Sequence, residues 1–387
     1  MKDWMELSKM ELSGKERALR MLNFEEVDRI PVIGGWAAHG DFLTKASGVK
    51  TKYSFAMSTW ENPMRVALKA YKNVGADLIP QFILPKRLET TTGDDLGRST
   101  EFSLGGARAI DPLRYKTPED VVEYVQNLPK PEDLRSAFES DDAYRRYVAD
   151  MKEAQEECGD DILWISGYGQ CGFMWYGMFG YQPYLLACLG YRNEMKKLFE
   201  YSGEHGRLYN EVIVKAVEEE GLPPFVYGGQ DICYDHGPMI SPKLLDEIYF
   251  PYLKRAIEPL RNAGIKTIWH CDGDIMPIIG RLIEVGIDGF QGFQEEYGVD
   301  LDKIASMKTK SGDKPIIFGS VSVTSTLPFG TVEDVKRSVE RCINIAASGG
   351  GFVLAPTSTV GPDIPVDNIF AMYEHGKNYG RKFVSKS

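Results

Sequence analysis

The feature that most constrains the fold is a regular alternation of short strand-like segments with longer helix-like segments. The predicted strands cover residues 29–33, 77–82, 162–166, 224–228, 265–270, 287–291, 315–320 and 351–355. Helical patterns between most of them indicate a parallel sheet, and eight such units favour a single α/β (β/α)8 TIM barrel. A doubly wound open sheet is the alternative, but no G-x-G-x-x-G sequence follows the first predicted strand.

The chain is expected to form one domain. Its 387 residues exceed the usual size of a single core, but barrels with insertions reach this length. No low-complexity linker or internal repeat divides the sequence. We therefore predict one barrel domain over residues 1–387, with an N-terminal helical extension at 1–28 and an insertion that covers the barrel at 84–160.

Composition narrows the classes of partner. The formal charge of −11 argues against nucleic acid and against an anionic membrane surface. The sequence shows neither a secretory leader nor an apolar run of membrane-spanning length. The six cysteines lack close C-x-x-C spacing, which favours reduced thiols in a cytoplasmic protein. Oligomeric state stays open, and a homodimer is one possibility.

The fifth predicted strand runs directly into His270, Cys271 and Asp272. Residues two apart on an extended segment point to the same side, so His270 and Asp272 are expected to face one pocket. Catalytic groups of α/β barrels lie at such strand ends. Alternatively, His270 only ends the strand and Asp272 caps the next helix.

Other predicted strand ends are also rich in polar and aromatic groups. A rim that served stability alone would not need so many, because each buried polar group must find a partner. We predict that Asp231 and Glu295 join His270 and Asp272 as catalytic candidates. The predicted substrate-binding residues at these ends are Trp36, His39, Gln81, Tyr168, Gln170, Gln230, Gln291 and Ser320.

An aromatic segment at residues 168–181 follows the third predicted strand. Phe173 and Trp175 within it are predicted to line a pocket wall for a flat apolar ligand. The alternative is that these rings are packed core beneath a loop. Five glycines in or just before this segment favour an irregular loop over a packed helix.

Several short segments together carry a resemblance to a known family. They are residues 16–32, 230–231, 241–242, 251–254, 270–275, 286–288, 319–321 and 350–356. In the order and spacing of these segments, over nearly the whole chain, the sequence resembles the uroporphyrinogen decarboxylase superfamily, and more closely its corrinoid-dependent methyltransferase branch. The resemblance implies a (β/α)8 barrel, in agreement with the independent strand count.

The sequence departs from the family pattern at two places. Porphyrin decarboxylases carry arginines after the first strand, whereas residues 34–41 here contain none. The thiol-methylating branch holds zinc with His-x-Cys and a later Cys, and this sequence has His270, Asp272 and Ser358 at those places. The resemblance thus implies a zinc site with harder ligands, suited to polarising oxygen. Otherwise the metal has been lost, and Asp272, Asp231 or Glu295 acts as a general acid or anchors the substrate.

These features predict a methyltransferase that takes a methyl group from a small methylated substrate, preferably an aryl methyl ether, and passes it to Co(I). The sequence contains no Asp-x-His-x-x-Gly cobalamin-binding segment, so the corrinoid must arrive on a separate corrinoid protein. Two alternatives remain: a methylcorrinoid:thiol methyltransferase of the coenzyme M type, and a decarboxylase of a substrate other than a porphyrin.

Overall fold

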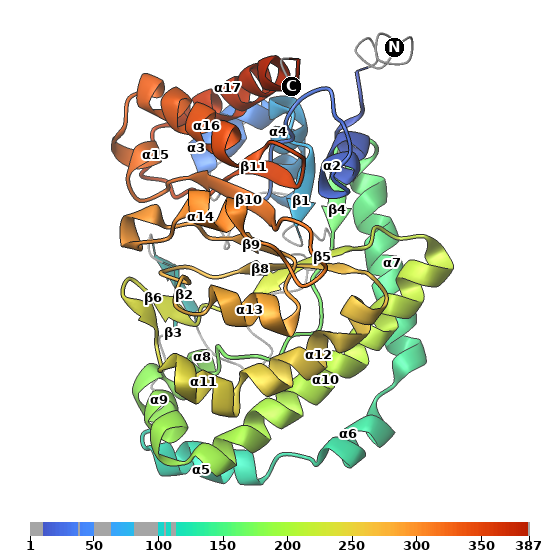
Figure 1. Ribbon diagram of the computed structural model, residues 1–387, viewed down its shortest axis with the longest axis vertical. Helices are drawn as coiled ribbons and strands as arrows, with labels where there is room; N and C mark the ends of the chain where they lie inside the picture. Colours follow the sequence, from blue (N-terminus) through green and yellow to red (C-terminus); the bar gives the residue numbers. More distant parts are fainter. Residues whose placement is uncertain are drawn as a thin grey trace.

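The computed structural model describes residues 11–37, 39–49, 63–80, 100–103, 106–109 and 114–385. Parallel strands lie at the centre, and helices cover them on the outside (Figure 1). The parallel strands are β1 (Leu78–Pro80), β4 (Leu163–Ile165), β5 (Phe225–Gly229), β8 (Lys266–His270), β9 (Gly289–Gln291), β10 (Ile316–Val321) and β11 (Phe352–Pro356). Each of these strands overlaps a predicted strand, and none extends more than one residue beyond the predicted bounds.

The strands follow one another in barrel order without forming a continuous ladder. One sheet has the order β11-β10-β9-β8-β5, and β1 pairs with β4 in a separate two-stranded sheet. Single parallel bridges span the gaps, from Val32 to Leu354, from Ile33 to Leu78 and from Ser166 to Val226. The expected α/β architecture is therefore confirmed, whereas the strand ladders do not close the barrel.

The first predicted strand, residues 29–33, differs most from the expectation. Only Val32 and Ile33 make bridges there. Pro31 has no N–H to donate to a ladder, although its carbonyl accepts from Leu354 N at 2.9 Å. The side chain of Arg29 is held in an ion-pair cluster. The segment therefore occupies the strand position without regular pairing.

Helices connect the strands and pack around them. They are α2 (Gly14–Leu22), α3 (Gly40–Ser47), α4 (Pro63–Val74), α5 (Pro118–Gln126), α6 (Pro131–Ala137), α7 (Ser140–Cys158), α8 (Tyr176–Phe179), α9 (Tyr181–Gly190), α10 (Arg192–Glu220), α11 (Pro242–Ile248), α12 (Phe250–Asn262), α13 (Ile279–Val285), α14 (Leu301–Ser306), α15 (Thr326–Phe329), α16 (Val332–Ala346) and α17 (Val366–Val384). The short elements are β2 (Thr100–Ser103), β3 (Gly106–Ala109), β6 (Cys233–Tyr234), β7 (Gly237–Pro238) and the 3-10 helix η1 (Glu295–Tyr297). No helix in the described residues is long and apolar enough to cross a bilayer.

Alternation along the strands divides the core into two parts. In β8, Ile268 belongs to a cluster inside the ring of strands, and its neighbour Trp269 packs in the larger cluster outside. Both are fully buried. This is the period of two expected for strands that are covered on both faces.

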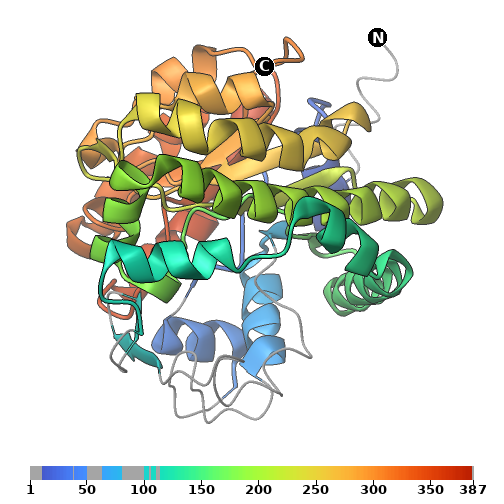
Figure 2. The same ribbon diagram turned by 90° about the horizontal axis from the view of Figure 1, so that it is seen from below.

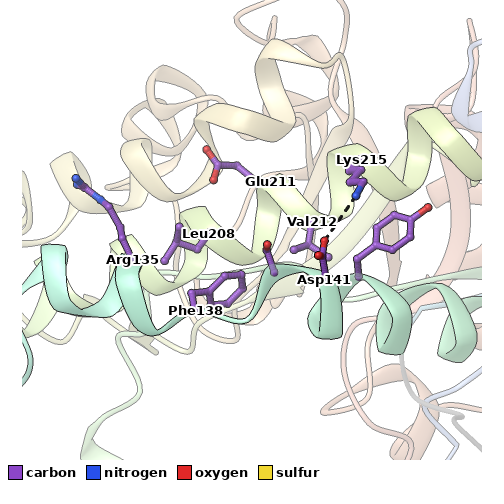
Figure 3. Close-up of a pocket in the computed structure, with 9 residues that line it drawn as sticks. Arg135, Phe138, Asp141, Leu208, Glu211, Val212 and Lys215 are labelled. Atoms are coloured by element: carbon purple, nitrogen blue, oxygen red, sulfur yellow. Dashed lines mark ion pairs between the residues drawn. The ribbon is translucent and has the colours of Figure 1, made fainter.

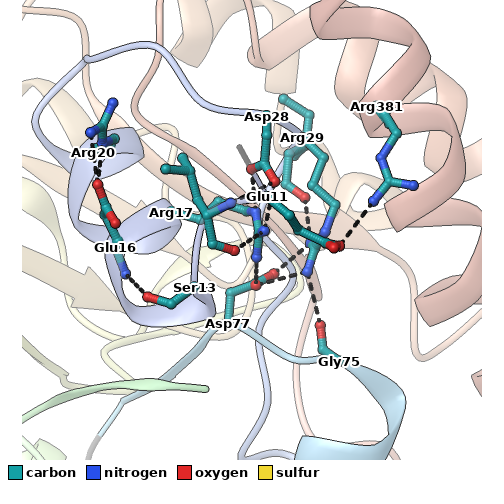
Figure 4. Close-up of polar contacts among 12 residues, drawn as sticks. Glu11, Ser13, Glu16, Arg17, Arg20, Asp28, Arg29, Gly75, Asp77 and Arg381 are labelled. Atoms are coloured by element: carbon teal, nitrogen blue, oxygen red, sulfur yellow. Dashed lines mark hydrogen bonds and ion pairs between the residues drawn. The ribbon is translucent and has the colours of Figure 1, made fainter. Parts of the chain in front are cut away.

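A buried charge cluster ties α2 to the start of β1 (Figure 4). Asp77, which is 1% exposed, accepts hydrogen bonds from Arg17 at 2.6 Å and from Arg29 at 2.7 and 2.9 Å. The backbone N–H of Val32 adds a bond of 2.9 Å, and Asp28 binds the other side of the Arg17 guanidinium. Asp77 precedes β1, so this cluster lies at the opposite end of the strands from His270.

Helices α10 and α12 pack against each other, and α7 lies against α10 on the same flank (Figure 2). Glu204 of α10 is fully buried beside three arginines, Arg135, Arg207 and Arg255. Burial would raise the pKa of Glu204, but hydrogen bonds from Arg207 and Arg135 outweigh it and lower the pKa to about 2. The division into an N-terminal extension, a barrel and an insertion stays a prediction.

Candidate active site

Three predicted residues meet at the C-terminal ends of two neighbouring strands. Strand β5 pairs with β8 so that Gly229 lies opposite His270, and Asp231 and Asp272 follow two residues later. One ligand atom from each of Asp231, His270 and Asp272 lies within 4.8 Å of the others. His270 Nε2 is 3.5 Å from Asp231 Oδ1 and 3.9 Å from Asp272 Oδ1. The His-x-Asp spacing therefore does bring both side chains to one point.

Gly229 permits the close approach of these two strands. A Cβ atom at this position would lie 1.9 Å from the carbonyl oxygen of His270, which is impossible without moving the strand. The backbone N–H of Asp272 then donates to Asp231 Oδ1 at 3.1 Å. Asp231 is thus fixed by the same turn that presents His270.

Asp272 is an unusual carboxylate. Its Oδ1 atom is buried and has no hydrogen-bond partner among the described residues, while Oδ2 accepts from Ser358 at 3.1 Å. Burial raises the pKa of the Asp272 carboxyl above its usual value, and the Asp231 charge adds to that shift against the opposing effect of His270. An unpaired buried oxygen beside a second acid and an imidazole is the environment that a cation would stabilise.

The donor set fits a divalent metal ion. Two carboxylates and one imidazole are zinc ligands in proteins, and a catalytic site needs three protein ligands with one open position. Ser358 was predicted as the third ligand. It donates to Asp272 instead, and Asp231 is placed to serve as the third ligand.

Gln230 and Gln170 lie together and organise the loop after β4. Gln230 Nε2 donates to Gln170 Oε1 at 2.9 Å. Gln230 Oε1 accepts from the backbone N–H groups of Phe173 and Met174 at 2.6 and 3.0 Å. Both the NH₂ group and the oxygen of the Gln230 amide are therefore used within the protein, next to Asp231.

The aromatic segment contains a packed core residue and two side chains with unpartnered polar atoms. Phe173 is fully buried among Tyr184, Phe199 and Tyr249, so it packs as core. Trp175 and Tyr168 each carry a buried polar atom, Nε1 and the hydroxyl, with no hydrogen-bond partner among the described residues.

Trp36 lies at the end of the first strand position. Its ring centroid is 5.4 Å from that of Tyr227 inside the ring of strands.

Other predicted residues are held elsewhere. Glu295 accepts from Ser320 at 2.8 Å and pairs with Arg341, and neither Glu295 nor Ser320 belongs to the Asp231–His270–Asp272 group. His39 caps α3: its Nδ1 accepts from Phe42 N at 3.2 Å, and its Nε2 faces Ile364 O at 2.9 Å. Gln81 falls outside the described residues.

Sequence reasoning missed Tyr227, and it placed Gln294 among the polar groups at the strand ends without a role. The Tyr227 hydroxyl donates to Gln291 Oε1 at 3.1 Å, and Gln294 Oε1 accepts from Gly273 N at 2.5 Å. Alternation along β5 was a usable signal, because it places Tyr227 on the inner face. The partner of Gln294 could not be predicted, since it depends on the path of a loop.

A hollow on the outer surface is separate from this site (Figure 3). It lies between the α6–α7 segment and α10, and none of the predicted site residues lines it. The lining residues are Arg135, Phe138, Ser140, Asp141, Tyr144, Leu208, Glu211, Val212 and Lys215.

A family model matches the part of the chain that carries the site. Residues 230–379, which contain Asp231, His270, Asp272 and Ser358, match the family model of uroporphyrinogen decarboxylase (URO-D). Named methyltransferases match over nearly the whole chain.

Two relatives carry the name methylcobamide:CoM methyltransferase MtaA. The protein of Methanosarcina barkeri strain Fusaro is 22% identical over 370 residues, covering 94% of this chain and 97% of its own. A second Methanosarcina barkeri protein of that name is 21% identical over 369 residues, with the same coverage.

A solved structure shares the fold. A methyltransferase from Methanosarcina mazei superposes with a TM-score of 0.63 at 18% identity, over 95% of this chain and 99% of its own. At this identity the likeness shows a shared fold.

Proposed function

We propose that this protein transfers a methyl group between a corrinoid carried on a separate protein and a small substrate. The substrate heteroatom binds beside the Asp231–His270–Asp272 group. The observation that carries the proposal is this group, with its unpaired Asp272 Oδ1, at the strand ends of a barrel homologous to methylcobamide-dependent enzymes.

The direction that the relatives favour is transfer from a methylcorrinoid to a thiol. Both named relatives act on a methylcobamide and CoM, and they align over 94% of this chain. A zinc ion held by Asp231, His270 and Asp272 would act there as a Lewis acid towards the substrate heteroatom. The protein groups themselves position that heteroatom and exclude water from it.

A second candidate is the removal of a methyl group from an aryl methyl ether. The donor set favours it, because carboxylate and imidazole are harder ligands than thiolates and suit an oxygen leaving group. Trp36 and Tyr227 form an aromatic pair inside the ring of strands and supply an apolar wall for a ring-shaped substrate.

We place the docking site for a protein partner on a surface at the C-terminal ends of the strands. The large exposed apolar side chains of the described residues all lie in connections that follow the C-terminal ends of barrel strands. They are Met174, Tyr181, Leu186, Leu189, Tyr234, Tyr297 and Phe329, which we call the rim surface. Elements α9, β6 and α15, which carry five of these side chains, lie on the same side of the molecule in Figure 1, and exposed apolar groups gathered on one side mark an interaction site. A corrinoid protein docked there would bring its cobalt to the side on which His270 opens.

The test uses the purified protein supplied with zinc. Metal content is measured first, and then the loss of methylcobalamin is followed spectroscopically with coenzyme M as the thiol. A parallel reaction uses methoxylated aromatic compounds and a reduced corrinoid protein. We expect methyl transfer in one of the two reactions, and loss of both activity and bound zinc in His270→Ala.

The matched control is His236→Ala, because His236 is 80% exposed and belongs to no part of the site. Failure of both methyl-transfer reactions, or release of CO₂ from a carboxylated substrate, would overturn the proposal. A thiol-dependent reaction alone would decide against the ether, and the reverse result would decide against the thiol.

A further inference from the structure

Gln291 is buried at the end of β9 and uses both ends of its amide. Its Nε2 donates to the carbonyl oxygens of Thr357 at 2.7 Å and of Pro356 at 3.3 Å. Both partners are pure acceptors, so the NH₂ group must point towards β11. This fixes the opposite end of the amide, Oε1, as the oxygen.

The Oε1 atom of Gln291 faces two donors. It accepts from the Tyr227 hydroxyl at 3.1 Å, and it lies in hydrogen-bond contact with His270 Nδ1. An amide oxygen only accepts, so Nδ1 of His270 must carry the proton. Strand register makes this contact possible, because His270 and Gln291 are direct partners across β8 and β9.

A proton on Nδ1 leaves Nε2 as the free nitrogen of the neutral ring. Nε2 is the atom that faces Asp231 Oδ1 at 3.5 Å and Asp272 Oδ1 at 3.9 Å. The lone pair of the imidazole is therefore aimed at the point where the two carboxylates converge. A metal-binding histidine requires this arrangement, because its second nitrogen must donate to a fixed acceptor.

We propose that Gln291 is a positioning residue that sets the Nδ1–H tautomer of His270 and so directs Nε2 towards Asp231 and Asp272. Gln291 was expected to bind substrate, but each of its polar atoms already has a protein partner. Its effect on zinc affinity rests on the proposed function. Its effect on the tautomer does not, because the hydrogen bonds exist without a metal.

The first measurement is the tautomer. Nitrogen NMR of the metal-free protein labelled in its histidines, recorded with the His270 ring neutral, should show the proton on Nδ1. His270→Ala assigns the signal. Gln291→Met has a similar volume but no acceptor, so the proton should move to Nε2. Gln291→Glu, as the neutral acid, keeps an acceptor for Nδ1 and an O–H donor for the carbonyls of β11, so it should keep the proton on Nδ1.

The second measurement is zinc affinity, determined by competition with a chelator. We expect Gln291→Met to weaken zinc binding by about 10–100-fold, as the loss of the acceptor behind a ligating histidine does, and Gln291→Glu to restore most of it. Asn368→Leu is the matched control, because it removes a buried amide that likewise donates to two backbone carbonyls, those of Leu327 and Gly330, without touching His270.

The outcomes separate the two proposals. A proton on Nε2 of His270 in the unaltered protein, or no change of tautomer in folded Gln291→Met, overturns the role of Gln291. The expected tautomer in a protein that binds no zinc would overturn the metal-assisted function and leave the role of Gln291 standing. Equal loss of zinc affinity in Gln291→Met and Asn368→Leu would show that Gln291 affects zinc binding only through the packing of the protein.

Discussion

The role of each carboxylate in the site depends on which of its two oxygen atoms already has a hydrogen-bond partner. Asp272 has one oxygen bound by Ser358 and the other unpaired, and Asp231 has one oxygen bound by the Asp272 N–H. An unpaired buried oxygen costs about 1–3 kcal/mol unless something binds it. We therefore expect Asp231 and Asp272 to be metal ligands, whereas Ser358 holds Asp272 in place through a hydrogen bond.

Substitutions of the two acids and of Ser358 should therefore weaken zinc binding to different degrees. Asp272→Asn and Asp231→Asn each remove a charged ligand and should abolish stoichiometric zinc. Ser358→Ala removes only a hydrogen bond to Asp272 and should weaken zinc binding by about tenfold. Metal analysis after gel filtration, with a chelator titration for Ser358→Ala, measures both effects. A loss of zinc in Ser358→Ala as complete as that in Asp272→Asn would make Ser358 a ligand.

Several residues of this site could be predicted from the sequence, whereas the hydrogen bonds between them could not. His270, Asp272 and Asp231 could be predicted because parallel strands present their C-terminal ends at one edge. The Gln291–His270 contact needs the register of β8 on β9, which no periodicity reveals. His39 looked like a rim residue, because nothing in the sequence shows that Ile364, 325 positions later, accepts from its ring.

At the scale of elements, buried carboxylates hold helices to the strands and to each other. Asp77 joins α2 and residues 29–32 to β1, and Glu204 joins α10 to α6 and α12. Removing one partner from such a cluster leaves charges without compensation. The sequence segment 28–32, part of the family resemblance, is thereby explained by structure rather than by catalysis.

Asp77→Asn should lower the free energy of unfolding by about 3–5 kcal/mol, because Arg17 and Arg29 lose their shared buried counter-charge. Urea unfolding followed by circular dichroism measures this. The control is Asp367→Asn, whose ion pair with Lys45 is exposed and should be worth less than about 1 kcal/mol. Equal effects of the two substitutions would contradict a stabilising role for the cluster.

Glu204→Gln should destabilise the protein in a pH-dependent manner. The pKa of Glu204 falls from 4.5 to about 2 on folding, so its charge stabilises the folded state by about 3 kcal/mol at neutral pH. That contribution is complete above the unfolded pKa and is lost as the pH falls through 4.5 towards 2. Urea unfolding should show a deficit relative to the unaltered protein that is roughly half as large at pH 3 as at pH 7, because folded Glu204 still carries most of its charge at pH 3.

Glu211→Gln is the control for this experiment, because Glu211 pairs with the same Arg207 but is 51% exposed. It should change the unfolding free energy by less than about 1 kcal/mol at either pH. A deficit in Glu204→Gln that persists unchanged at pH 3 would contradict the ionic origin of the effect.

At the scale of the whole molecule, the two ends of the strands carry different kinds of residue. The Asp77 cluster lies where the strands begin, and the Asp231–His270–Asp272 group and the rim surface lie where they end. Such a division is general in α/β barrels. It could be predicted from the order of strands and helices, although the incomplete strand ladder could not, since it arises from local pairing near Pro31 and Ser166.

The rim surface makes a prediction about the protein partner. Phe329 is 84% exposed, and Phe329→Glu should weaken docking of a corrinoid protein. The measured quantity is the ratio of the rate with protein-bound corrinoid to the rate with free methylcobalamin. We expect this ratio to fall about tenfold, equivalent to about 1.4 kcal/mol. An unchanged ratio for Phe329→Glu and for Tyr234→Glu would place the docking surface elsewhere.

The position of the Asp77 cluster also bears on how this lineage can change. Because the charges that secure the barrel are gathered at the far end of the strands, exchange of residues around His270 leaves that anchorage intact. The polar side chains at the His270 end can change without loss of the ion pairs that stabilise the fold. Because the Asp77 cluster lies at the N-terminal ends of the strands, residues at the C-terminal ends are free to evolve without loss of stability.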